Sequence, residues 1–431
     1  MSAAALALGS RGWRGGWRDG LAYGGLGLPL AFVALPLYVV LPAHYATAYG
    51  VPLAALGAVL LGARLLDAFV DPFIGRWADA LFGRSVRSAW AALGAASLLV
   101  AAGLHALFHP AVEAGAALLW WCAVGLALTY LGYSVAAVIH QAWGARLGGD
   151  ETQRARIVAW REGLALAGVL AASVLPSLAG LTATSAAVAV LLVLGVAGLW
   201  YAPRPRMQAH ARTTARGSLA LPWGEVRFRR LLAIYLCNGI AGAIPATLVL
   251  FFVRDRLQAP AFEPLFLGTY FAAAALALPI WVRLVARIGL ARTWLAAMLL
   301  SVAAFIWTSQ LGSGDVVAFA VVCLASGIAL GADLTLPGAM LTGVIQRAGH
   351  AQRAEGAYFG WWNFATKLNL ALAAGLALPV LQALGYAPGA RDAAALDALT
   401  LAYCLLPCAL KLAAAALLLL GWIRIDEETH P

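Results

Sequence analysis

The sequence predicts an all-α polytopic membrane protein with twelve transmembrane helices in two six-helix bundles. Three observations predict this fold class: an apolar composition, a series of long apolar runs, and arginines that gather in every second loop, on one side of a membrane. Of the 431 residues, 63% are hydrophobic and only 11% are charged, against roughly 25% charged in an ordinary soluble domain. Because backbone donors and acceptors cannot stay unpaired in hydrocarbon, each apolar run is expected to be a helix.

Apolar runs, broken by charge or by Gly and Pro, define the predicted spans. Several exceed the roughly 20 residues that cross the hydrocarbon, so they are expected to tilt or protrude. The spans are 21–42, 53–80, 88–109, 114–145, 156–179, 183–201, 229–253, 264–287, 292–311, 316–344, 356–383 and 396–423.

The longest hydrophilic stretch lies at the midpoint of the chain, which suggests two equivalent halves. The predicted organisation is a cytosolic tail (1–20), an N-terminal six-helix bundle (21–201), a cytosolic linker (202–228), a C-terminal six-helix bundle (229–423) and a second cytosolic tail (424–431).

The placement of arginine predicts the orientation. Only Arg254, Arg256 and Arg391 fall in loops on the predicted outer side, and Arg64 lies inside a span. Almost all the others sit at the termini or in the loops after spans two, four, six, eight and ten, so both termini are predicted to be cytoplasmic. The net charge of +10 therefore reflects topology, and we expect no nucleic-acid partner.

Motifs for catalysis are missing from the sequence. It contains no HExxH, GxSxG or Walker motif, so we expect no enzyme and no cofactor. The five cysteines lie inside apolar segments without CxxC spacing and are interpreted as small apolar fillers. A receptor or scaffold that does not transport remains an alternative, and it predicts no counterflow activity.

Three charged residues lie on one face of the second span. Arg64, Asp67 and Asp71 are at i, i+3 and i+7. An aspartate at the bilayer centre costs about 2.5–3.5 kcal/mol on insertion scales, and Arg64 can neutralise only one of the two. A bound H⁺ or Na⁺ is the natural partner of the other, and Pro72 exposes an upstream carbonyl as an additional oxygen ligand. The alternative is a purely structural salt-bridge cluster.

Further polar residues interrupt the other spans. Lys367 lies about 16 Å along its helix from the inner end, which is too deep to snorkel, so it needs an anion, either a carboxylate such as Asp333 or a substrate group. Arg161 and Glu162 are adjacent and are expected to point apart. His140 is expected to be a capping or interface residue rather than a proton relay.

Four stretches together resemble the glycoside–pentoside–hexuronide:cation symporters of the melibiose permease type, a branch of the major facilitator superfamily. They are "RLLDAFVDP" (64–72), "GLAYGGLGLPLAF" (20–32), "HQAWGARLGGDETQRARIVAWREGLALAG" (140–168) and "RAEGAYFGWWNFATKLNLALAAG" (353–375). The last resembles the family signature E-G-x-Y-x-G-x-W-x-F-x-x-K. The resemblance covers nearly the whole chain, in order, and implies the major facilitator fold.

The resemblance also implies roles for individual residues. The cation site would be Asp67, Asp71 and Ser134, with Arg64 as its charge partner and with Na⁺ as the only metal ion considered. Arg161, Lys367 and Trp362 would line the substrate pocket, and we add Asn238 as a buried polar residue of the same kind. Gly75, Asp79 and Arg84 resemble the inward-loop gate motif, with a spacing one residue longer.

The sequence also departs from the sugar-binding members. Leu28-Pro29 and Ala137 replace their sugar-binding acidic positions, and Gly343 and Gln346 stand where acidic residues are usual. Val70 replaces an Asn that could ligate a cation, which favours H⁺ over Na⁺.

The sequence therefore predicts a multi-pass protein of the bacterial inner membrane, expected to be a monomer in the lipid bilayer. It would couple H⁺ or Na⁺ to symport of a sugar, a glycoside or a related small solute by alternating access. The alternative is a major facilitator transporter of an amphiphile, a lipid or a drug, with antiport also open.

Overall fold

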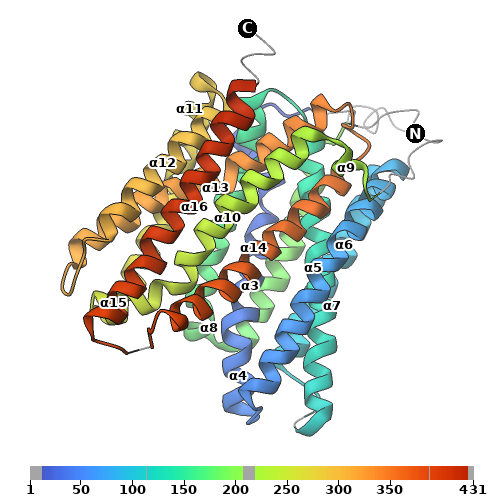
Figure 1. The fold of residues 1–431 in the computed structure, drawn as a ribbon. Helices are drawn as coiled ribbons and strands as arrows, with labels where there is room; N and C mark the ends of the chain where they lie inside the picture. The colour runs from blue at the N-terminus through green and yellow to red at the C-terminus, as the bar shows by residue number, and fades with distance from the viewer. Residues whose placement is uncertain (1–11, 113, 207–218, 388, 426–431) are drawn as a thin grey trace, which may run out of the picture. The chain divides into compact units, whose positions relative to one another are not determined.

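The regular structure is helical throughout the part of the chain that the structure describes, and no β-strand occurs there. The computed structural model describes residues 12–112, 114–206, 219–387 and 389–425, and Figure 1 shows the order of their helices. An all-helical chain is expected of a protein in lipid, because a helix satisfies its backbone hydrogen bonds within one segment.

The first predicted span is a helix of several pieces. It consists of α2 (Trp17–Gly24), α3 (Gly27–Leu35), a π-helical turn (Pro36–Val40) and α4 (Leu41–Ala48). Pro36 and Pro42 begin the last two pieces, since proline lacks the N–H that a helix interior needs.

Four long helices complete the N-terminal part. They are α5 (Leu53–Arg84), α6 (Val86–Phe108), α7 (Gly115–Arg146) and α8 (Glu151–Tyr201). Within α8, Gly180 has φ +78° and ψ 174°, a conformation open mainly to glycine. This turn separates the fifth and sixth predicted spans.

The rest of the chain repeats this organisation. The elements are α9 (Leu221–Gly224), α10 (Val226–Phe251), a π turn (Phe252–Arg256), a 3₁₀ turn (Pro260–Phe262), α11 (Glu263–Ile288), α12 (Leu290–Thr308), α13 (Val316–Arg347), α14 (Glu355–Ala383), α15 (Ala393–Thr400), a π turn (Leu401–Leu405), α16 (Leu406–Leu418) and a π turn (Leu419–Ile423).

Every predicted span falls almost entirely on helix. Among the described residues, nine helical stretches are long and apolar enough to cross a membrane, and the stretch Glu151–Tyr201 covers two predicted spans. The count of twelve crossings and the side on which the termini lie stay predictions.

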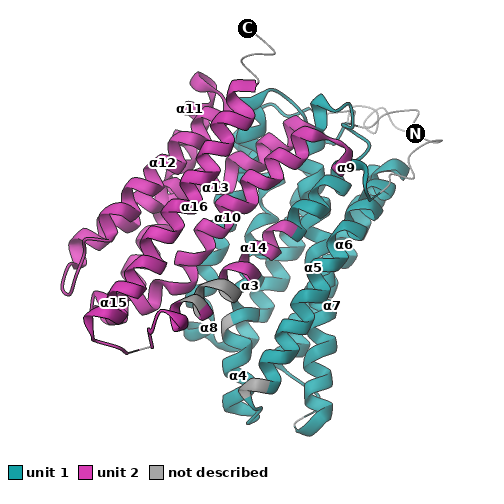
Figure 2. Cartoon of the chain, viewed as in Figure 1, with its two compact units in different colours: residues 1–222, 345–364 teal, residues 223–344, 365–431 magenta. Residues whose placement is uncertain are grey.

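The chain forms two compact units, shown in Figure 2. The first contains 1–222 and 345–364, and the second contains 223–344 and 365–431. The sequence placed 345–364 in the C-terminal bundle, whereas its contacts group it with the first unit. Parts of the predicted tails and linker, namely 1–11, 207–218 and 426–431, lie outside the described residues.

Small residues let helices of the first unit approach closely. A Cβ added to Gly24 would lie 2.7 Å from the carbonyl oxygen of Trp160, and one on Gly27 would lie 2.6 Å from that of Arg161. In lipid, such close packing replaces the hydrophobic driving force that holds soluble helices together. These glycines therefore seat α2 and α3 against α8.

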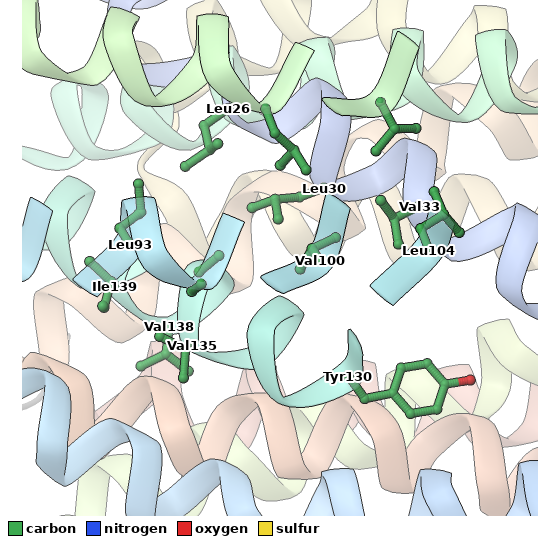
Figure 3. Close-up of a cluster of buried hydrophobic side chains, with 14 of the residues drawn as sticks. Leu26, Leu30, Val33, Leu93, Val100, Leu104, Tyr130, Val135, Val138 and Ile139 are labelled. Carbon is green, nitrogen blue, oxygen red and sulfur yellow. The ribbon is translucent and has the colours of Figure 1, made fainter. Parts of the chain in front are cut away.

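The core of the first unit is shown in Figure 3. Buried side chains come from Leu26, which precedes α3, and from α3, α6 and α7, among them Leu30, Val33, Leu93, Val100, Leu104, Tyr130, Val135, Val138 and Ile139. This core fixes α7 beside the helices that carry the candidate site.

Candidate functional site

The two aspartates of α5 are buried in the first unit. Asp71 is 0% exposed and Asp67 is 6% exposed. The two residues are four apart and therefore lie on the same helix face. A buried aspartate is rare in proteins unless it is paired or functional. The structure therefore confirms that the two aspartates are buried, while their role as cation ligands stays a prediction.

Ser134 of α7 contacts this pair directly. Its Oγ donates a hydrogen bond of 2.6 Å to Oδ1 of Asp67, and Ser134 is itself 1% exposed. A hydroxyl that donates to a carboxylate forms one of the stronger hydrogen bonds in proteins. Asp67 and Ser134, predicted as members of one site, do lie together.

Arg64 contacts the aromatic ring of Tyr38. Its guanidinium carbon lies 3.7 Å from the centroid of the Tyr38 ring, a cation–π geometry. The role of Arg64 as charge partner of the cation site stays a prediction.

The backbone of α14 touches α5 beside the aspartates. A Cβ added to Gly360 would lie 2.6 Å from the carbonyl oxygen of Asp71, and one on Gly75 would lie 2.1 Å from the carbonyl oxygen of Gly356. No other residue type fits such a contact without a shift of the backbone. Gly75, predicted as part of a gate, thus has a packing reason to be glycine.

Asp79 caps the start of α14. Its Oδ1 accepts from the backbone N–H of Gly356 at 2.8 Å, and its Oδ2 accepts from that of Ala357 at 2.8 Å. An anion at a helix N-terminus satisfies orphan N–H groups and is favoured by the helix dipole. The predicted gate aspartate therefore ties α5 to α14 within the first unit.

Arg146 completes this cluster from α7. Its Nη2 lies 2.8 Å from Oδ1 of Asp79 and 3.0 Å from Oε2 of Glu355. The Arg146 side chain is 1% exposed and that of Glu355 is 2% exposed, so the guanidinium neutralises two carboxylates away from water. Sequence reasoning missed Arg146 and Glu355, since each is a single charge at a helix end with nothing to indicate its partner. Arg84, the third predicted gate residue, is exposed.

The prediction that Arg161 and Glu162 point apart is wrong. Nε and Nη2 of Arg161 donate to Oε1 of Glu162 at 2.9 and 2.7 Å. Long side chains of adjacent residues can fold toward each other, and a buried guanidinium gains from an adjacent anion.

His140 of α7 packs on α2. Its Nε2 lies 2.7 Å from the carbonyl oxygen of Tyr23, whose hydroxyl donates to the carbonyl of His140 at 3.2 Å. These contacts across two helices fit the expected interface residue.

The remaining predicted substrate residues belong to different units. Trp362 is 6% exposed in the first unit, whereas Lys367 is half-buried in the second. Asn238, also in the second unit, is 4% exposed and its Nδ2 donates to Oδ1 of Asp333 at 3.1 Å.

Asp333 is the centre of a polar cluster that the sequence did not reveal. The sequence analysis considered Asp333 as a partner of Lys367. In the structure, Nζ of Lys411 from α16 donates to Oδ2 of Asp333 at 2.8 Å. Nε1 of Trp294 from α12 donates to its Oδ1, also at 2.8 Å. Lys411 is one of only two lysines in the chain. This rarity is the one signal in the sequence that indicates a special role for it.

The fold and these buried charges define a membrane transport protein. The family model described as MFS/sugar transport protein matches residues 20–427. The chain belongs to this family of transport proteins, which confirms the resemblance found in the sequence. It is a multi-pass membrane protein and not an enzyme.

One curated relative is the inner membrane symporter YicJ of Escherichia coli (strain K12). The two are 26% identical over 239 residues, so the match spans 52% of this chain and 52% of the relative. The chain thus aligns with only about half the length of that relative.

Solved structures share the fold. The E. coli fucose:proton symporter FucP has a TM-score of 0.67 and 17% identity, over 93% of this chain and 98% of that one. A bacterial homologue of the iron transporter ferroportin, in an outward-facing state, has a TM-score of 0.68 and 16% identity over the same shares. The human organic anion transporter MFSD10 has a TM-score of 0.67 and 17% identity, over 93% and 99%. These similarities establish the major facilitator fold.

Proposed function

We propose that the protein is a cation-coupled symporter of a sugar or a related small solute in the bacterial inner membrane, working by alternating access. The observation that carries this proposal is the buried pair Asp67 and Asp71, with the Ser134 hydroxyl 2.6 Å from Asp67. Membership of a sugar-transport family and the symporter YicJ support it. No cofactor enters the proposal beyond the coupling ion.

The cation acts by changing the cost of burying these carboxylates. A proton or Na⁺ at the pair removes charge from an apolar setting, so the loaded carrier closes around it at lower free energy. Substrate binding is then linked to cation binding, and the linkage is reciprocal. The apolar Val70 between the aspartates supplies no oxygen ligand, which favours H⁺ over Na⁺.

The cluster of Asp79, Arg146 and Glu355 is proposed as the gate. It holds the start of α14 to α5 and α7 in the first unit, and α14 continues into the second unit at residue 365. A conformational change that moves the start of α14 has to break these bonds, so their free energy contributes to the equilibrium between states.

Arg161, Lys367, Trp362 and Asn238 are proposed as substrate contacts. Arg161 keeps N–H donors beyond the two that it gives to Glu162, because a guanidinium carries five. Export by antiport is the other mode that this machinery permits.

The test is uptake by purified protein in proteoliposomes under an imposed proton or sodium gradient. A screen of labelled sugars and glycosides identifies a substrate that the wild type accumulates. Asp67→Asn and Asp71→Asn are expected to keep downhill exchange and to lose uphill accumulation, because the coupling charge is gone. Asp397→Asn is the matched control, since the side chain of Asp397 is 76% exposed. Unchanged uphill uptake in both site variants would refute the proposal.

A further inference from the structure

The second unit contains a cavity of about 430 Å³. Side chains from α10, α11, α12, α13, α14 and α16 line it, and all of them belong to this unit. Small-molecule pockets usually measure roughly 300–1,000 Å³, so the cavity has the size of a ligand site.

Most of the cavity wall is apolar. Its aromatic side chains include Phe266, Tyr270, Phe271, Phe305, Phe319 and Tyr403. A strongly hydrated solute gains little from such a wall, whereas an apolar body gains about 25 cal/mol for each Å² removed from water. The wall therefore favours a ligand with a substantial apolar part.

Asp333 joins several polar side chains at the wall of the cavity. Its carboxylate accepts from Asn238, Trp294 and Lys411 at 3.1, 2.8 and 2.8 Å. These three donors, one of them the Lys411 ammonium, engage both oxygens of the Asp333 carboxylate. Lys411 and Asp333 cancel each other's charge, so a charged ligand would enter a neutral, poorly solvated site at a high cost.

Two buried amide oxygens line the cavity and indicate which groups a ligand would supply. Asn238 and Asn369 line the cavity, each 4% exposed, and neither Oδ1 has a hydrogen-bond partner among the described residues. Nδ2 of Asn238 donates to Oδ1 of Asp333, so the Oδ1 of Asn238 faces away from that carboxylate.

Asn369 packs against Gly239, the residue that follows Asn238 in α10. Its Nδ2 would be 1.9 Å from a Cβ added to Gly239. The Asn369 amide therefore fits only because residue 239 is a glycine. Two buried acceptors without donors are costly unless a ligand supplies O–H or N–H groups.

We propose that this cavity binds an uncharged amphiphile, with its apolar body against the aromatic wall and a hydroxyl-bearing head donating to Asn238 and Asn369. The proposal narrows the substrate of the proposed function from a sugar or related small solute to an uncharged solute with an apolar body, and it rests on that function only for the step of transport.

The experiment measures binding without any ion gradient. Protein in lipid nanodiscs is titrated calorimetrically with four probes, and empty nanodiscs are subtracted. Phenylbutanediol carries both parts of the predicted ligand, phenylbutanoate and phenylbutylamine carry the same body with a charged head, and glucose carries hydroxyls without the body. We expect phenylbutanediol to bind and each of the other three to bind at least about tenfold more weakly.

Variants locate the site. Gly242 lines the cavity, and a Cβ added to it meets nothing within 4 Å, so Gly242→Leu fills the space and is expected to abolish binding. Asn369→Ala removes one acceptor and is expected to weaken the diol about tenfold. Thr342→Val is the control, because this hydroxyl bonds to its own helix at Gly338 and does not line the cavity.

Thiol protection gives a second readout. Cys323 and Cys408 line the cavity, whereas Cys122 lies in α7 of the first unit. Bound phenylbutanediol is expected to slow alkylation of the two cavity thiols and to leave Cys122 unchanged.

The outcomes separate the two proposals. Binding of glucose or of a charged analogue as tight as that of the diol, or diol binding that survives Gly242→Leu, overturns this inference. A chain that binds the diol but accumulates no solute under a gradient refutes the proposed function alone. A chain that accumulates a sugar but does not bind the diol refutes the inference alone.

Discussion

Arg146 shows how one side chain can hold several helices. Its guanidinium contacts carboxylates from α5 and α14 and lies with its carbon 4.3 Å from the centroid of the Phe82 ring. Arginine suits this place because a planar fork can serve two anions and an aromatic face together. Nothing in the sequence distinguishes Arg146 from the other arginines at helix ends, since its partners are 67 and 209 positions away in the chain.

Replacing Arg146 by alanine is expected to destabilise the protein. The change would leave the carboxylates of Asp79 and Glu355 buried without their shared cation, which typically costs about 3–5 kcal/mol. The melting temperature of the purified protein measures this loss. Arg84→Ala, at an exposed position of α5, should stay within about 0.5 kcal/mol of the wild type. Equal melting temperatures for both variants would contradict the assigned role.

At the scale of elements, glycine decides which helices touch. Gly75 lies on α5 where the backbone of Gly356 leaves no room for a Cβ, whereas a Cβ on Gly83 of the same helix meets nothing within 4 Å. The sequence presents both as glycines of one apolar helix. The contact with α14 is what makes glycine necessary at position 75, whereas position 83 has room for a larger residue.

Gly75→Ala and Gly83→Ala form a matched pair. The first is expected to lose about 1–3 kcal/mol through overpacking against α14. The second is expected to gain about 0.5–1 kcal/mol, because alanine is the better helix former. Thermal unfolding in the same lipid or detergent compares them. Loss of stability in both, or in neither, would show that the close contact does not determine the effect.

At the scale of the molecule, the arginines predict which side of the membrane each loop faces. Cysteines introduced at single exposed positions test this, because the native cysteines are buried or partly buried. A membrane-impermeant maleimide applied to intact cells is expected to label Gly312→Cys, in a predicted outer loop. It should label Arg84→Cys, in a predicted inner loop, only after the membrane is opened. The reverse pattern would invert the topology.

The sequence by itself determined the helices and the buried charges of this protein. Apolar length and the need to satisfy backbone hydrogen bonds in lipid are local properties, so each predicted span lies on helix, and Asp67 and Asp71 are buried as expected. Tertiary structure alone decided the partners of the charged groups. It paired Arg161 with Glu162 and Asp333 with Lys411. It also placed Arg64 against the ring of Tyr38 and grouped residues 345–364 with the first unit. The physical reason is that pairing depends on which helix faces pack together, and a local pattern of residues does not contain that information.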